Sequence, residues 1–596
     1  MAAPVSDPST TRRKALAAAA VVGAGATTGC LDRLRSIFGL QPSGRVTLGI
    51  KTEPPDADPY SLRIARDIES RFETAGIGAN ITPMATEELR RQVLLNQGFD
   101  VFVARVPMVD RTPDALHSLL HSTGVSALGW RNPFGYTNLR VDELLDRQRR
   151  VQGQARQSAV TELLGMVTQT QPFSVVAAPE NIRTARTDRY EGWREVDLDS
   201  PLGYLAVERH DDTDEAAEDL RVVTTNQRVT ENLNPLAVEF RSHGTVTGLL
   251  YDTLCQRTDT GLTPWLADSV EFRTVDGGLR ATVRLRSDLT WHDDEPLTAG
   301  DVAFTYDFLR DTSLEAGENA VPTPRFYGRA SLVESTTVID SRTITLEFGD
   351  AIRPVARRAF TVPILPEHVW TERTDVARVG GVELNGQVTD ALVAANVPAV
   401  GSGPVAFVRN TPKQSLVLER FDDHFLYDEG PASVPTPVRD GPDFERLVVS
   451  VVGSDAAAVE QVANGEADVT GSSLGARAVP RIGRESDLEL LVTAANSFYL
   501  VGYNTRRQPL TNPRFRNGLG HLIDKAQLVE TVFEGYARPA TTLLAETDWA
   551  PADLTFEDAD PVTPFFGSEG ELDAARAREA FRAAGYNYSD DRLVVR

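Results

Sequence analysis

Apolar and polar residues alternate from residue 44 onward with two different periods. Residues 45–50 and 99–103 are short apolar runs that predict β-strands. Residues 61–74 and 141–151 place apolar side chains three and four positions apart, which predicts amphipathic helices with charged outer faces. Strands separated by helices are typical of an α/β layer with a parallel core.

The chain is long enough for more than one domain. Its 596 residues predict two or three domains, and its composition, 41% hydrophobic and 24% charged, is that of a folded globular protein. Residues 208–215 are almost wholly polar and follow neither period, and an apolar strand is expected soon afterwards at 221–223. We therefore expect an interdomain linker over 209–220.

The first 30 residues have the form of an export signal. Arg12 and Arg13 precede a small apolar run over 15–26, which is about twelve residues where a membrane-spanning helix needs about 20. The arginine pair resembles a twin-arginine (Tat) signal. The small residues before Cys30 resemble a lipobox, which predicts lipidation of Cys30 and a tether over 31–43. An ordinary cleavage site that merely contains Cys30 is the alternative.

Charge and cysteine content narrow the class of protein. Asp and Glu outnumber Lys and Arg by 85 to 61, and the net charge of −24 would repel the phosphates of nucleic acid. Lysine occurs only at positions 14, 51, 413 and 525, a pattern that resembles proteins of salt-loving archaea; an acidic protein with chance lysine depletion is the alternative. The two cysteines, Cys30 and Cys255, provide no disulfide framework and no metal site.

A series of short motifs follows the predicted linker in a fixed order. It begins with Asn-Leu-Asn-Pro at 232–235 and ends with Phe-Glu-Gly-Tyr at 533–536. The series resembles the family of extracellular solute-binding proteins that serve dipeptide and oligopeptide ABC importers. Each motif is weak alone, but their order over about 300 residues is specific. The motifs between the two ends are residues 250–254, 263–269, 283–302, 401–404, 415–420, 465–469, 503–505 and 523–525.

The order of the remaining segments departs from that family. Residues 574–586 resemble the helix that precedes the final third of the family fold, and the chain ends at 596. That third is matched instead near the front, which implies a circularly permuted chain. Residues 592–596 and 45–49 would then be neighbouring strands. The front segments that carry the match are 64–81, 99–100, 113–114, 135–138 and 141–145.

The resemblance implies an α/β fold with two lobes, like that of class II periplasmic binding proteins, with an extra subdomain. The hinge is expected near 173–178 and 498–503. The second lobe would comprise residues 44–178 and 498–596, the crossing back to the first lobe 179–208, the first lobe 221–256 and 398–497, and the inserted subdomain 257–397.

The resemblance also implies residues that contact a ligand. Ser402, Gly403 and Asn504 match family positions near the cleft. Peptide-binding relatives commonly carry a Gly-Trp pair and then an acid that accepts the ligand ammonium. This chain has Arg105 and Val106 in place of the pair and Thr112 in place of the acid. Asp110 is a substitute acid, and Arg105 is either a carboxylate or phosphate contact or a solvated surface residue.

Two other patterns suggest different chemistry. Gly-Ser-Ser-Leu-Gly at 471–475 satisfies G-x-S-x-G, with Asp487 and His521 following in hydrolase order, so a secreted serine hydrolase using Ser473 is an alternative. His117 and His121 stand four apart, as zinc ligands would, but no third ligand follows at a recognisable spacing. A solvated helix face is therefore preferred. The sequence contains no Walker or dinucleotide motif, so ATP hydrolysis would belong to a partner.

Together these features predict a lipid-anchored, monomeric solute-binding protein at the extracellular face of the membrane. It would capture peptides or a related small solute by hinge closure, without a cofactor or metal, and deliver them to ABC permease and ATPase subunits. A solute-sensing domain without transport is a further alternative.

Overall fold

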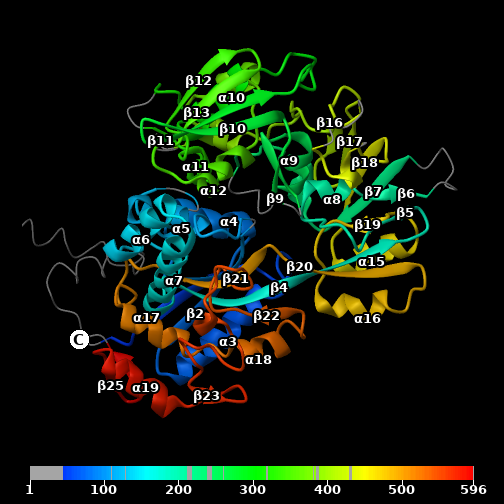
Figure 1. Ribbon diagram of the computed structural model, residues 1–596. Helices are drawn as coiled ribbons and strands as arrows, with labels where there is room; N and C mark the ends of the chain where they lie inside the picture. Colours follow the sequence, from blue (N-terminus) through cyan, green and yellow to red (C-terminus); the bar gives the residue numbers. More distant parts are fainter. Residues whose placement is uncertain are drawn as a thin grey trace, which may run out of the picture.

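In the computed structural model, the chain folds into two lobes with a third, smaller sheet packed on one of them (Figure 1). The structure describes residues 44–594 except 109, 128, 130, 211–217, 238–243, 259–260, 317–319, 380–381, 384–387, 428–432 and 440. The predicted signal, Cys30 and the tether, and most of the predicted acidic linker, lie outside the described residues. Within the described part of the chain, no helix has both the length and the apolar character needed to cross a bilayer.

The terminal lobe, which we define as residues 44–178 and 497–594, is built from both ends of the described chain. Its sheet runs in the order β4, β21, β3, β1, β2. β1 pairs in parallel with β2 and β3, whereas β21 is antiparallel to β3 and β4. The strands are β1 Thr47–Thr52, β2 Gly78–Pro83, β3 Val101–Pro107, β4 Phe173–Arg186 and β21 Ser497–Tyr503.

Alternate side chains of β3 cover opposite faces of this sheet. Val101 and Val103 join the core on one face, and Phe102 and Ala104 join the core on the other, as the period of two requires. The predicted helix over 61–74 is confirmed as α3 Ser61–Thr74. The first face is covered by α3, α17 Pro513–Gly520, α18 Lys525–Thr531 and α19 Ala574–Ala583, and the second by α5 Ala115–Leu120, α6 Leu139–Arg150 and α7 Gly153–Thr170.

In the central lobe, residues 179–496, the same sheet continues beyond β4, and it shares one continuous core with the smaller sheet. Its strands are β7 Asp219–Thr224, β16 Val405–Thr411, β17 Ser415–Arg420, β18 Arg446–Val451, β19 Val469–Thr470 and β20 Leu488–Ala494, with α15 Asp455–Ala463 on one face. The smaller sheet comprises β10 Ala267–Val275, β11 Gly278–Leu285, β12 Ser335–Asp340 and β13 Thr343–Glu347, with α10 Ala299–Arg310 beside it.

Two adjacent segments cross between the lobes. The first half of β4 pairs with β21 in the terminal lobe, and its second half pairs with β20 in the central lobe. The chain returns between Ala494 and Ser497, next to the first crossing. Because the crossing strands run antiparallel to their neighbours, the expected parallel core is wrong in the middle of the molecule, where the sheet is mixed.

The two ends of the described chain lie against each other. The Val46 amide donates to the Leu593 carbonyl at 2.8 Å, and the Leu593 amide donates to the Gly76 carbonyl at 2.9 Å. The short strand β26 Arg592–Val594 thereby extends the β1 region, and the Leu593 side chain is fully buried among the residues around α3.

Replacing Leu593 by alanine should destabilise the terminal lobe. The change leaves a cavity in a packed core, which costs about 2–5 kcal/mol. Arg592→Ala, at an exposed position of the same strand, should have little effect. Urea unfolding followed by circular dichroism measures both; equal midpoints for the two variants would contradict the packing described here.

Candidate functional site

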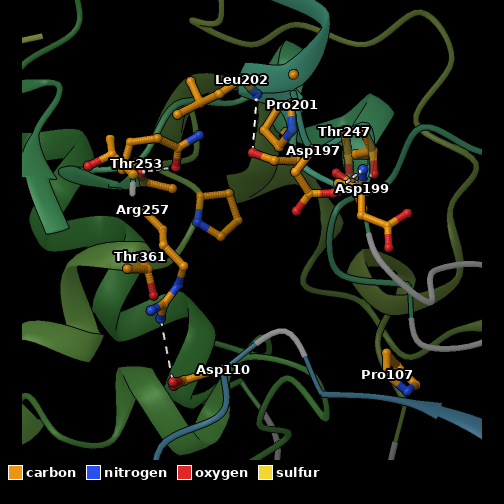
Figure 2. A pocket seen from close by; sticks show the side chains of 18 of the residues that line it. Pro107, Asp110, Asp197, Asp199, Pro201, Leu202, Thr247, Thr253, Arg257 and Thr361 are labelled. Carbon is orange, nitrogen blue, oxygen red and sulfur yellow. Dashed lines mark hydrogen bonds and ion pairs between the residues drawn. The ribbon is translucent and has the colours of Figure 1, made fainter. Parts of the chain in front are cut away.

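Two adjoining cavities lie between the lobes. The first has a volume of about 930 Å³. Its wall is formed by residues 106–108, 110, 115, 118 and 119 of the terminal lobe, and by residues within 191–208, 244–258 and 324–329 of the central lobe, together with Arg358. Figure 2 shows Pro107 and Asp110 on one side of it and Asp197, Asp199 and Leu202 on the other. Both lobes therefore contribute its wall.

The second cavity, of about 600 Å³, lies closer to the crossing strands. Pro107, Asp199, Gly244 and Thr245 line both cavities, so the two form one interlobe cleft. The terminal lobe contributes residues 53–59, 85–90 and Arg105, and the central lobe contributes residues 181–183, 222–231 and 471–473, among others. Volumes of this size are typical of small-molecule sites.

Arg105 lies at the junction of the second cavity and the hinge. Its Nε donates to Ser497 Oγ at 2.7 Å and one Nη donates to Asn181 Oδ1 at 2.8 Å. Ser497 begins β21 and Asn181 lies in β4, so Arg105 contacts both crossing strands. It is half-buried, which excludes the solvated surface arginine that was the alternative. Both hydrogen-bond partners are neutral, and the nearest interaction with a carboxyl is a longer-range one with Glu53.

Glu53 places a buried carboxyl group in the same cavity. The residue is only 8% exposed, and burial, together with the nearby Asp58, raises the pKa of its carboxyl. Asp58 is committed to the fold, since it accepts from the Ser61 amide at 2.6 Å and from the Tyr499 hydroxyl at 2.7 Å. The sequence interpretation missed Glu53. Its position directly after β1, at the carboxyl end of a parallel strand, is the signal that could have found it.

Asp110 lines the first cavity, but its carboxylate is held by the protein. Arg358 binds one of its oxygens, and Arg257 Nη2 lies 3.4 Å from the other (Figure 2 shows the Arg257 contact). Burial disfavours the charged form, yet these arginines outweigh it and lower the pKa of Asp110. The expectation that Asp110 substitutes as the acceptor of a ligand ammonium is therefore corrected, because two cations already occupy its oxygens.

Arg358 also binds Asp114, and this contact closes the cleft at one side. Asp114 is fully buried and is shared with Arg149, whose Nε lies 2.5 Å from it. Asp114 and Arg149 belong to the terminal lobe, whereas Arg358 belongs to the inserted region of the central lobe. We call Asp110, Asp114, Arg149 and Arg358 the interlobe latch. Sequence reasoning found the Pro-Asp motif at 113–114 but not its distant partner.

Thr112 and Asn504, both expected at the cleft, do not line either cavity. Asn504 is 1% exposed and donates to the carbonyls of Gln97 and Phe99, at 3.0 and 2.9 Å. The Thr112 hydroxyl is buried and has no partner among the described residues. Asn504 thus fixes the loop before β3 rather than a ligand.

Ser402 and Gly403 also contact other parts of the protein and hold the fold together. The Ser402 hydroxyl donates to buried Asp252 at 3.1 Å. A Cβ on Gly403 would lie 2.2 Å from the Leu249 carbonyl oxygen, so glycine is required by close packing of two backbone segments. Gly403 therefore allows two backbone segments to pack closely, and it lines neither cavity.

The hydrolase arrangement is not assembled among the described residues. Ser473 lines the second cavity and accepts from the Ile182 amide at 3.2 Å. His521 belongs to the terminal lobe, where its ring stacks on Phe566 and its Nδ1 contacts the Pro564 carbonyl at 2.7 Å. With its ring held there and no hydrogen bond from Ser473, His521 is not placed to act as a general base for Ser473.

The chain resembles known proteins over its second half. The family described as "Bacterial extracellular solute-binding proteins, family 5 Middle" matches residues 261–595, more than half of the chain. The probable peptide-binding protein YejA of Agrobacterium fabrum is 25% identical over 338 residues, covering 54% of this chain and 50% of that protein. The oligopeptide-binding protein AppA of Bacillus subtilis is 24% identical over 297 residues, covering 49% and 47%.

A solved structure of AppA in complex with a nonapeptide is 18% identical, with a TM-score of 0.43, and covers 62% of this chain and 65% of that chain. The chain spans about half the length of the curated relatives it matches.

Replacing Arg358 by methionine should shift the lobes toward an open arrangement. The change removes the cation that Asp110 and Asp114 share and leaves them with Arg257 and Arg149 alone. Breaking a buried ion pair costs about 3–5 kcal/mol, and the remaining arginines set the loss at the lower end of that range. Arg150→Met is the matched control, because Arg150 also bridges to the central lobe, through Asp350 at 2.8 Å, but in an exposed pair worth about 0–1 kcal/mol. Small-angle X-ray scattering should show expansion only for Arg358→Met; identical profiles for the two variants would argue against the latch.

Proposed function

Because the chain belongs to the bacterial extracellular solute-binding proteins of family 5, we propose that it captures a small solute outside the cell and delivers it to an ABC importer. The observation that carries this proposal is the interlobe cleft, whose walls come from both lobes. A ligand that contacts both walls stabilises the closed arrangement, and a hinge of two strands allows opening. Permease and ATPase subunits are the partners that would receive the solute.

The proposed activity is binding rather than catalysis. Members of this family bind solutes for ABC transporters and are not enzymes. The described residues of the cleft place no general base beside Ser473. A cleft between two lobes is the shape expected of a protein that closes around a solute, and such binding requires no catalysed reaction.

The ligand that we propose is a peptide or a related small solute with both a carboxylate and an amine. Arg105 and Glu53 line the same cavity, each within range to influence the other electrostatically but without a direct ion pair. A ligand carboxylate would bind the guanidinium, and a ligand ammonium would relieve the burial of the Glu53 carboxylate. If the ligand carboxylate bound Arg105 through both Nε and Nη2, it would replace the present hydrogen bonds of Arg105 to Ser497 and Asn181. The peptide-binding names of two relatives support this class of solute.

We further propose that the protein is anchored to the membrane through its terminal lobe. β1 follows the predicted tether and lies in that lobe, away from β7 and Ser402 of the central lobe. Lipidation of Cys30 would attach the tether to the outer membrane surface. The contact between Val46 and Leu593 supports a circular permutation, because the ends of the described chain meet within one lobe.

One binding experiment tests whether Arg105 binds the ligand carboxylate and whether Glu53 binds the ligand ammonium. Short peptides, their C-terminal amides and their N-acetyl derivatives are titrated by calorimetry into the wild type, Arg105→Ala and Glu53→Gln. A charge-assisted hydrogen bond contributes about 1.5–3 kcal/mol, so Arg105→Ala should weaken peptides with a free carboxylate roughly 10–100-fold and leave the amides unchanged. Glu53→Gln should weaken peptides with a free amine and leave the N-acetyl forms unchanged.

Arg446→Ala, which removes an exposed arginine of β18 paired with Asp219, controls for loss of positive charge. Equal weakening of every peptide form by Arg105→Ala would remove that residue from ligand recognition. If no peptide binds but another solute does, the proposed peptide ligand is wrong, whereas the proposed role as a solute-binding protein stands.

A further inference from the structure

Two histidines and one aspartate meet on the side of the terminal lobe. His117 lies in α5, and His121 follows its last residue, so the two rings stand on one face with centroids 4.5 Å apart. Asp146 comes from the adjacent helix α6. The histidine pair was set aside in the sequence because no third ligand followed at a recognisable spacing. The fold supplies that third group from a helix that begins 18 residues after His121.

The distances among these groups suit a metal ion. Asp146 Oδ1 lies 3.2 Å from His117 Nε2 and 3.5 Å from His121 Nε2. The three ligand atoms all lie within 4.8 Å of one another. Tetrahedral zinc with bonds of about 2.0–2.1 Å holds its nitrogen and oxygen ligands about 3.3 Å apart. Only small side-chain movements would therefore bring all three atoms onto one ion.

We propose that His117, His121 and Asp146 form a binding site for a zinc-like divalent transition metal. Two imidazoles and one carboxylate favour zinc, cobalt, nickel or copper over magnesium and calcium, which prefer oxygen ligands. The Asp146 side chain is 43% exposed, so the site can be reached from solvent on that side. The site lies outside the residues that line the interlobe cleft, and it is separate from solute capture.

Neighbouring groups are placed to orient the ligands. His121 Nδ1 accepts from the Thr123 amide at 3.2 Å and lies 2.9 Å from Thr123 Oγ1, and these two contacts fix the orientation of the ring. Asp142 accepts from the Ser122 amide at 2.9 Å and from the Ser122 hydroxyl at 2.5 Å, which fixes the turn after His121. This orientation of the ring by a second layer of contacts is a usual feature of metal-binding histidines.

The environment keeps the His117 imidazole in the neutral form that binds metals. Burial lowers the pKa of His117 to about 4, against the opposing hydrogen bond to Asp146. Arg149 and His121 add a smaller effect in the same direction. Nε2 of the neutral ring shares a hydrogen bond with Asp146 Oδ1 at 3.2 Å, so a metal at Nε2 would replace the proton of that bond and leave the ring proton on Nδ1.

A bound ion would join two helices that carry the interlobe latch. Asp114 immediately precedes α5, and Arg149 lies one turn beyond Asp146 on α6. These two residues meet at 2.5 Å, about one turn from His117 and Asp146 on the same helix pair. Metal binding would hold α5 against α6 and thereby fix the spacing of the two latch residues.

Cobalt binding to the full chain, purified without a histidine tag, tests the site. The wild type should bind one Co²⁺ per chain with visible ligand-field absorption that zinc abolishes. His117→Gln and Asp146→Asn should each weaken binding by at least about tenfold. His368→Gln is the matched control, because His368 lies 2.9 Å from Asp293 as a single imidazole beside a carboxylate, and it should bind cobalt like the wild type.

Thermal unfolding of the same proteins provides a second measurement. Zinc should raise the unfolding temperature of the wild type and of His368→Gln, and not that of the folded His117→Gln or His121→Gln variants. Absence of a cobalt spectrum in the wild type would overturn the proposal. Cobalt binding that is unchanged by His117→Gln would do the same.

Discussion

The structure depends on two adjacent segments that cross from one lobe to the other, the strand β4 and the short connection between Ala494 and Ser497. β4 is a single strand of 14 residues that pairs with β21 in the terminal lobe and with β20 in the central lobe. Both lobes are therefore extensions of one mixed sheet, and relative movement is concentrated where few residues cross. Arg105 contacts β21 and β4 at this place, so a ligand bound there lies next to the axis of movement.

Some charged side chains of the cleft pair with one another across the lobes, and others do not. Asp110 and Asp114 are neutralised by arginines across the interface, and this pairing closes the cleft at one edge. Arg105 binds the neutral Ser497 and Asn181, and the buried Glu53 carboxyl interacts electrostatically with Asp58, Arg90 and Arg105. The residues that hold the lobes together are therefore different from the two that we propose to contact the solute.

Much of the fold could be predicted from the sequence, because it depends on local pattern. The periodicity over 61–74 gave α3 with its bounds, and the ordered motifs indicated the family that matches residues 261–595. The candidate site was harder. Asn504 and Gly403 were expected to contact ligand and instead hold backbone segments, since polar and glycine positions near a cleft serve packing as readily as binding. Arg358 lies 244 residues from Asp114 in the sequence, so no local sequence pattern could predict their ion pair.

The central claim, that the lobes close around a solute, is tested most directly by measuring the distance between them. Spin labels at Ser70→Cys in the terminal lobe and Thr274→Cys in the central lobe are suitable, because both positions are exposed and Cys255 is buried. Cys30 is replaced by serine. Pulsed electron spin resonance should show a broad, longer distance without solute and a narrow, shorter one with it. Saturating solute that leaves the distance distribution unchanged would contradict the account.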